Sequence, residues 1–155
     1  MPIRLIDTGT VPCLRSQTLY HALARVKTSA IPDTVIFAAP AEPYVCIGFH
    51  QELEREIDVL YCKANGIPVV RRETGGRALY LDKDQLFVQW IFGQDRLRWR
   101  LESRFALFAG PLVQAYRALG ISAKFCPAND IQVAARKTFT SLQSGLHTSL
   151  RESAA

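Results

Sequence analysis

Apolar residues recur at helical spacing in three stretches of the chain. Residues 16–26 carry leucine and valine at this spacing, which predicts an amphipathic helix with Ser16 as its N-cap. Residues 101–119 carry a longer and stronger apolar stripe that predicts a second helix. A third, short helix is expected between Asp58, a good helix start, and Gly66, a good helix stop.

Short apolar runs between these helices predict strands. Residues 34–38 and 44–47 are joined by a proline-containing turn, which predicts a hairpin. The other expected strands are residues 67–70, 85–92, 121–125 and 131–134. Because helices and apparent hairpins are mixed along the chain, we expect an α+β fold and not a doubly wound parallel sheet.

The composition is that of one ordinary globular domain. The chain has 155 residues, of which 48% are hydrophobic and 21% charged. No apolar run approaches the roughly 20 residues needed to cross a bilayer, and the N-terminal MPIRLIDTGT lacks the apolar core of a signal peptide. We therefore expect a cytoplasmic protein with no membrane attachment.

The net charge and the spacing of the cysteines limit the kinds of ligand and partner that we expect. The formal net charge of +5 suits an anionic ligand or an acidic protein partner. The basic residues are scattered and no ladder of aromatic residues alternates with them, so nucleic acid is not expected as a partner. The four cysteines are far apart in the sequence, which argues against zinc; Cys46 and Cys62 are expected to be core residues.

One stretch, residues 69–82 with the sequence VVRRETGGRALYLD, carries the clearest functional pattern. Adjacent glycines allow a tight turn and let a ligand approach the main chain closely. Arg71, Arg72 and Arg77 flank the pair, and guanidiniums beside exposed backbone N–H groups suit a carboxylate or a phosphate. The same pattern is also typical of a tight hairpin with solvated arginines, and the glycine pair alone does not decide between them.

This stretch resembles the signature of the lipoate–protein ligase A family, the biotin/lipoate protein ligase catalytic domain, with the pattern Arg-Arg-x-Ser/Thr-Gly-Gly-Gly/Arg-Ala-Val-aromatic-His-Asp. Residues 45–51 resemble the strand and turn that precede the signature. Residues 127–133 and the Arg136-Lys137 pair resemble a later Asn-Asp-Ile strand and its lysine. The resemblance implies a mixed, mostly antiparallel central sheet with flanking helices, as in class II synthetases and biotin ligases.

The resemblance also implies an activity. Ligases of this family use ATP to activate lipoate or octanoate as an acyl-adenylate, and then transfer the acyl group to a lysine of a lipoyl carrier domain. The carrier would be the acyltransferase subunit of a 2-oxoacid dehydrogenase or a protein like the H protein of glycine cleavage. Some ligases also need a separately encoded accessory chain.

Each site residue then has an implied role. Lys137 would be the catalytic lysine that stabilises charge on the carboxyl and phosphoryl oxygens, and Asp130 would hold Mg²⁺. Arg72 would lie against the adenylate phosphate and the acyl carboxylate. The remaining substrate- and ATP-binding positions would be Thr74, Gly75, Gly76, Arg77, Ala78, Leu79 and Asn129.

Two alternatives to the ligase stay open. Transferases of the same fold carry the octanoyl group on a cysteine, and Cys126 lies in the right region, although it is closer to the Asn-Asp-Ile strand than that pattern requires. The chain could instead be an inactive, truncated relative that only binds an acyl group.

Similarity to the family stops after Lys137. Residues 1–137 are expected to form the ligase-like catalytic domain, and residues 138–155 a divergent tail of loop or poorly packed structure. A frameshift or a premature stop in a longer gene would give so abrupt a change. Leu81 also stands where the family has histidine.

Overall fold

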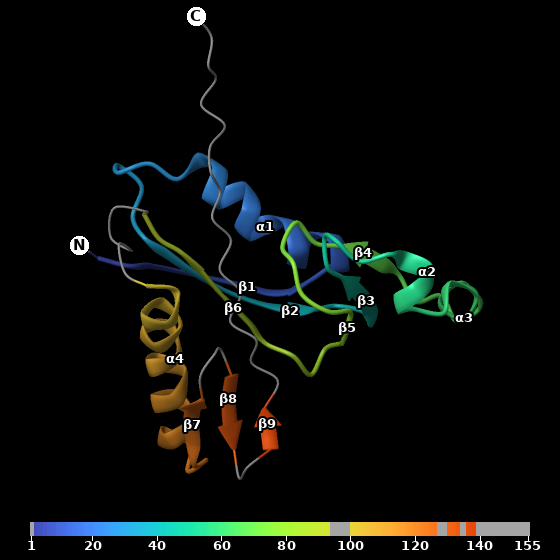
Figure 1. Ribbon diagram of the computed structural model, residues 1–155. Coiled ribbons are helices and arrows are strands. Elements are labelled where there is room, and N and C mark those ends of the chain that lie inside the picture. Colours follow the sequence, from blue (N-terminus) through green and yellow to red (C-terminus); the bar gives the residue numbers. More distant parts are fainter. Residues whose placement is uncertain (1, 94–99, 127–129, 134–135, 139–155) are drawn as a thin grey trace, which may run out of the picture. The chain divides into compact units, whose positions relative to one another are not determined.

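The computed structural model describes residues 2–93, 100–126, 130–133 and 136–138 (Figure 1). These residues form two compact units, of which the first ends at Gly93 and the second follows it. Strand pairing in the described residues gives three three-stranded sheets, two in the first unit and one in the second. The predicted α+β class is confirmed.

Two small mixed sheets make up most of the first unit. One has the strand order β1-β2-β6 and the other β4-β3-β5. In each sheet the middle strand has one parallel and one antiparallel neighbour. The elements of this unit are β1 (Arg4–Val11), α1 (Cys13–Val26), β2 (Thr34–Pro40), β3 (Tyr44–Ile47), α2 (Leu53–Glu56), α3 (Val59–Ala64), β4 (Val69–Arg71), β5 (Leu79–Leu81) and β6 (Phe87–Ile91).

The predicted hairpin of residues 34–38 and 44–47 is wrong. These residues form β2 and β3, which lie in different sheets. Both edges of β2 are already occupied, by β1 on one side and by β6 on the other, so no edge is left for β3. The backbone N–H of Ala41, just after β2, donates to the Val11 carbonyl, and the chain then leaves this sheet.

Helix α1 begins at Cys13, three residues before the predicted N-cap. Ser16 lies inside the helix and is buried, and its hydroxyl is hydrogen-bonded to the carbonyl oxygen of Cys13 and to the hydroxyl of Tyr44. The N-terminal end of the helix is satisfied from elsewhere in the chain: the Glu42 carboxylate accepts a hydrogen bond of 2.6 Å from the Cys13 N–H. A carboxylate at this end of a helix is favourable.

The predicted short helix is confirmed as α3. The Asp58 carboxylate caps it by accepting a hydrogen bond of 2.9 Å from the Tyr61 N–H. Gly66 follows it with φ of 62°, a conformation that side chains disfavour.

The second unit packs one helix against an antiparallel sheet. It comprises α4 (Leu101–Ala118), β7 (Ala123–Cys126), β8 (Asp130–Val133) and β9 (Arg136–Thr138). The predicted helix and the two predicted strands are confirmed, with shifts of one or two residues at their ends. Four buried residues form the core: Ala109, Val113, Ala123 and Ile131. No helix in the described part of the chain is long and apolar enough to cross a membrane.

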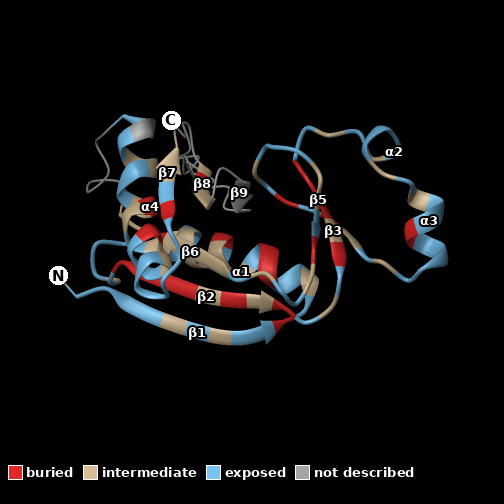
Figure 2. Cartoon of the chain, turned by 90° about the horizontal axis from the view of Figure 1, so that it is seen from below, coloured by how far each residue is buried: buried red, intermediate tan, exposed pale blue. Residues whose placement is uncertain are grey.

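Burial in the first unit is concentrated on β2 and β3 (Figure 2). Cys46 on β3 and Cys62 on α3 are both buried, as expected for core cysteines. Tyr44 is fully buried at 0% exposure, and its hydroxyl is hydrogen-bonded to Ser16 Oγ at 2.8 Å and to Gln17 Nε2 at 2.7 Å. These bonds join β3 to α1, and burial raises the pKa of the Tyr44 phenol, which stays neutral.

Replacing Tyr44 with phenylalanine tests this junction. The change removes one hydroxyl and leaves two buried polar partners on α1 without it, so we expect a loss of about 1–3 kcal/mol in the free energy of unfolding. Urea denaturation measures the loss. The matched control is Tyr61→Phe, because Tyr61 is 60% exposed and the same deletion there should cost under about 0.5 kcal/mol. Equal effects would show that the Tyr44 hydroxyl is not part of the junction.

Candidate functional site

The glycine motif crosses one end of the β4-β3-β5 sheet. Strands β3 and β4 are parallel, so their carboxyl ends lie at the same edge. The loop of residues 72–78 leaves β4 at this edge and returns in β5 on the other side of β3. It therefore passes over the turn of residues 48–51, which leaves β3 at the same place.

Arg72 fastens this loop from within. Its side chain is 3% exposed, and its guanidinium donates to three backbone carbonyls. The Nε and Nη2 groups donate to Gly75 at 3.1 and 2.9 Å, Nη2 donates to Arg77 at 2.9 Å, and Nη1 donates to Cys46 at 3.2 Å. The carbonyl dipoles replace the water that the buried charge has lost. The predicted contact of Arg72 with a bound anion stays a prediction, and the contacts seen are those of a clamp.

Arg71 fastens the neighbouring turn. Its Nη1 group donates to the carbonyl oxygens of Gly48, Phe49 and Gln51 at 3.0, 3.1 and 2.6 Å. The Gln51 side chain closes the same turn by accepting a hydrogen bond of 2.7 Å from the Gly48 N–H. Two consecutive arginines thus hold two different segments at one edge of the sheet.

Loop and turn also touch each other directly. The Phe49 N–H donates to the Thr74 carbonyl at 2.9 Å. At Gly48 there is no room for a side chain, because a Cβ atom there would lie against the carbonyl group of Gly76. Gly76 itself has φ of 102°, a conformation that favours glycine.

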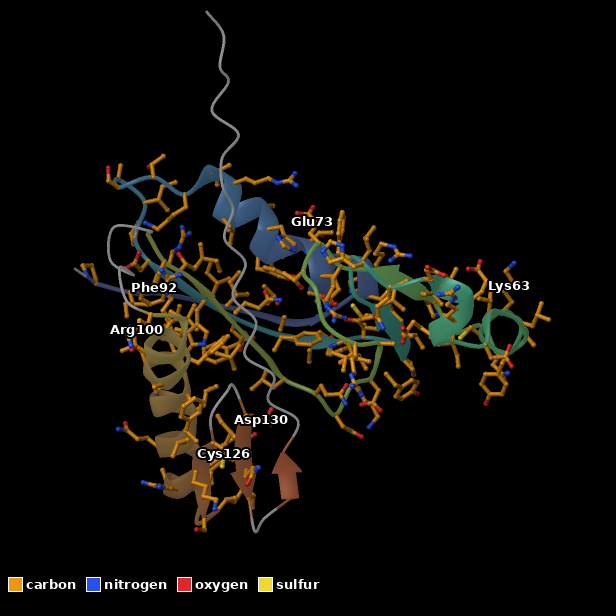
Figure 3. All side chains as sticks on the ribbon, viewed as in Figure 1. Lys63, Glu73, Phe92, Arg100, Cys126 and Asp130 are labelled. Carbon is orange, nitrogen blue, oxygen red and sulfur yellow. The ribbon has the colours of Figure 1, made fainter. Side chains whose placement is uncertain are left out.

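Helix α1 holds the first part of the loop. Glu73, labelled in Figure 3, accepts hydrogen bonds from Arg25 Nη2 at 2.9 and 3.1 Å. His21 Nδ1 lies 3.5 Å from the same carboxylate. The phenol of Tyr20 is hydrogen-bonded to the Thr74 side chain; burial nevertheless raises the pKa of Tyr20 to about 12, so the phenol is neutral at physiological pH.

These contacts leave a defined set of donors for a ligand. In the part of the chain that the structure describes, the backbone N–H groups of Gly75, Gly76 and Arg77 have no acceptor. All three residues are exposed, and no acidic group among the described residues pairs with the Arg77 side chain. Three amides and a guanidinium at one exposed loop can bind a carboxylate or a phosphate.

The remaining predicted residues lie along β5 and in the second unit. Ala78 and Leu79 are half-buried, and Leu79 packs against a buried cluster formed by residues of β3, β4 and β5. Asp130, half-buried, is opposite Cys126 in the β7–β8 ladder (Figure 3). Lys137 belongs to β9, opposite Gln132, and its side chain lies outside the described part of the chain, as does Asn129. The meeting of Lys137 and Asp130 with the glycine loop stays a prediction.

Sequence reasoning missed the residues of α1 that hold the loop. His21 and Arg25 are four residues apart, and such residues share a helix face. This basic pair was a usable signal, because a carboxylate is a favourable partner for it. Tyr20 gave no comparable signal, since an aromatic residue in an apolar stripe is usually only a core residue.

Comparison with known families decides the classification. The family profile described as "Lipoyl protein ligase A/B catalytic domain" matches residues 15–139. The chain belongs to this family.

Curated relatives in the family divide between two activities. Over 96 residues the chain is 38% identical to the lipoate-protein ligase LplJ of Bacillus subtilis. This alignment covers 62% of this chain and 28% of the relative. Over 124 residues it is 30% identical to the octanoyltransferase LipM of Geobacillus kaustophilus, which covers 79% of this chain and 45% of the relative. The chain therefore spans less than half of either curated relative.

Solved structures agree with the fold. A bi-partite lipoate protein ligase of Thermoplasma acidophilum, studied with its E2 lipoyl domain, superposes with a TM-score of 0.74 at 28% identity, covering 88% of this chain and 53% of that one. The Thermoplasma acidophilum protein Ta0514 with bound lipoic acid gives 0.71 at 28% identity, covering 88% and 60%. A lipoate-protein ligase A bound with ATP gives 0.73 at 26% identity, covering 88% and 59%.

Replacing Gly48 with alanine tests the packing at the centre of the site. The added methyl group would push against the Gly76 carbonyl and displace the loop, so we expect a loss of about 2 kcal/mol or more in the free energy of unfolding. The control is Gly110→Ala in α4, where a Cβ meets nothing within 4 Å and alanine should stabilise the helix by about 0.5–1 kcal/mol. If Gly48→Ala unfolds at the wild-type urea concentration, the close approach of turn and loop is wrong.

Proposed function

We propose that this chain is the acid-activating part of an ATP-dependent lipoate–protein ligase. It would activate lipoate or octanoate as an acyl-adenylate and pass the acyl group to a lysine of a lipoyl carrier domain. The observation that carries the proposal is the clamped loop of residues 72–77, whose free amides and Arg77 side chain are suited to the anionic head of an activated acid. The LplJ match and the related structures with ATP and with lipoic acid give independent support.

The chemistry requires charge stabilisation and orientation, and no covalent enzyme intermediate. A carboxylate oxygen of the acid attacks the α-phosphorus of ATP and pyrophosphate leaves; the carrier amine then attacks the acyl carbonyl and AMP leaves. In this proposal the loop amides and Arg77 hold the carboxyl and phosphoryl oxygens where negative charge develops. Lys137 adds positive charge at the same oxygens, and Ala78 and Leu79 line the acyl chain.

Mg²⁺ and the protein partners follow from the same proposal. Asp130 offers one half-buried carboxylate, and no group of three metal-binding side chains gathers among the described residues. This donor set suits Mg²⁺, which takes few protein ligands and fills its shell with water and phosphate oxygens; when bound, the ion would shield the triphosphate.

The lipoyl carrier would be a 2-oxoacid dehydrogenase subunit or a protein like the H protein, and an accessory ligase chain is proposed from the bi-partite relative.

A second candidate is octanoyl transfer through a cysteine thioester on Cys126. The LipM match extends over more of this chain than the LplJ match does. Cys126 is a free, half-buried thiol at the end of β7. An acyl-binding module without activity is the third alternative from the sequence, and it predicts acid binding without either reaction.

The test is pyrophosphate release from ATP with Mg²⁺ and lipoate. We expect release that depends on lipoate, and a loss of roughly a hundredfold or more in Lys137→Ala, because that residue would stabilise charge in the transition state. Arg77→Gln should raise the KM for lipoate and ATP by about tenfold through the loss of one charge-assisted contact. The control is Arg15→Gln, a change of equal charge at an exposed residue of α1.

Each alternative predicts a different result in this experiment. Acyl transfer from octanoyl carrier protein that disappears in Cys126→Ser, without pyrophosphate release, would replace the ligase by the transferase. Lipoate binding with neither reaction would leave the binding module. An unchanged rate in Lys137→Ala would remove that residue from the mechanism.

A further inference from the structure

Glu73 is a carboxylate placed where the proposed site needs positive charge. It lies two residues before Gly75, in the loop whose amides and Arg77 side chain would face a ligand in the function proposed above. Its side chain is 47% exposed, so its charge acts partly through solvent. An ionised carboxylate this close to the site would repel the carboxyl and phosphate groups that the proposed function requires.

Two basic residues of α1 meet this carboxylate. Arg25 Nη2 contacts both Glu73 oxygens, at 2.9 and 3.1 Å. His21, one helical turn earlier, brings Nδ1 to 3.5 Å of Oε2, and its side chain is 8% exposed. One face of a single helix therefore supplies both contacts to the carboxylate.

We propose that Arg25, assisted by His21, balances the charge of Glu73 and thereby keeps the glycine loop attractive to anions. Arg25 is then a positioning residue that acts on the ligand through Glu73. The identity of the anion, an acyl carboxylate or a phosphate, rests on the function proposed above. The charge balance itself rests only on the three side chains and the loop.

The solvent exposure of Arg25 and Glu73 distinguishes the proposed charge balance from a purely structural role. Arg25 is 62% exposed, and an ion pair with such exposed partners contributes little to folding stability. The same charge would act on an anion bound at the glycine loop, and this effect weakens as salt is added. Loss of Arg25 should therefore lower anion affinity at low salt while the unfolding midpoint stays close to that of the wild type.

The experiment measures binding of three anions by calorimetry: inorganic pyrophosphate, ATP and lipoate. At low ionic strength Arg25→Gln should weaken binding by about threefold to tenfold, and about 0.3 M salt should remove most of the difference. The double variant Arg25→Gln with Glu73→Gln should recover the affinity of Glu73→Gln alone, since no unbalanced carboxylate remains. Arg25→Lys should keep most of the affinity, and Arg15→Gln should change it by less than about twofold.

Each outcome has a fixed meaning. An Arg25→Gln affinity equal to that of the wild type, or a double variant that stays as weak as Arg25→Gln, overturns the charge balance. If the wild type binds pyrophosphate but never converts lipoate, the proposed function fails while the pyrophosphate affinities of the variants still decide this inference. If the wild type binds none of the three anions, both fail.

Discussion

A buried guanidinium that is bonded to backbone carbonyl oxygens fixes the glycine loop at the end of the β4-β3-β5 sheet. Arg72 joins β3, through the Cys46 carbonyl, to the first glycine of the pair and to the residue after the pair, Arg77. A charge removed from water is costly unless its hydrogen bonds are replaced, and the planar fork of arginine can serve several acceptors at once. The β4–β5 loop can cross the end of the sheet in one fixed position because these bonds exist.

The three arginines of the glycine motif, which look equivalent in the sequence, therefore have different structural roles. Arg71 holds the turn after β3, Arg72 holds the glycine loop, and Arg77 keeps its side chain at the surface. Helix α1 adds contacts at Glu73 and Thr74 on the other side of the loop. A loop held in this way keeps its amides oriented before a ligand arrives, which is what an enzyme needs where charge develops in a reaction.

Local patterns were sufficient for several of the elements around the glycine loop. The strand before the glycine pair and the short helix capped by Asp58 are predicted from residues close together in the sequence. The predictions that were wrong failed because residues far apart in the sequence make contacts that override the local pattern. The hairpin of β2 with β3 was wrong because β1 and β6 take both edges of β2, and Ser16 was wrong as an N-cap because Tyr44 lies against it inside the core.

The arginines show another limit of prediction from sequence. A pattern of residue types cannot say which guanidinium is buried, and the same residue type suits both an anion site and a carbonyl clamp. Glu42, which caps α1, and Glu73, which pairs with it, are likewise explained only by contacts made across tens of residues of sequence. Such contacts can be identified only from the folded structure, in which these distant segments lie side by side.

The stability of Arg72→Lys, measured without any ligand, tests whether Arg72 clamps the glycine loop. A lysine ammonium cannot reach the Cys46, Gly75 and Arg77 carbonyls together, so the free energy of unfolding in urea should fall by about 2–4 kcal/mol. Arg77→Lys, at the exposed position five residues on, should stay within about 0.5 kcal/mol of the wild type. A stable Arg72→Lys protein that has lost only its affinity for anions would contradict the clamp and make Arg72 a ligand-binding residue.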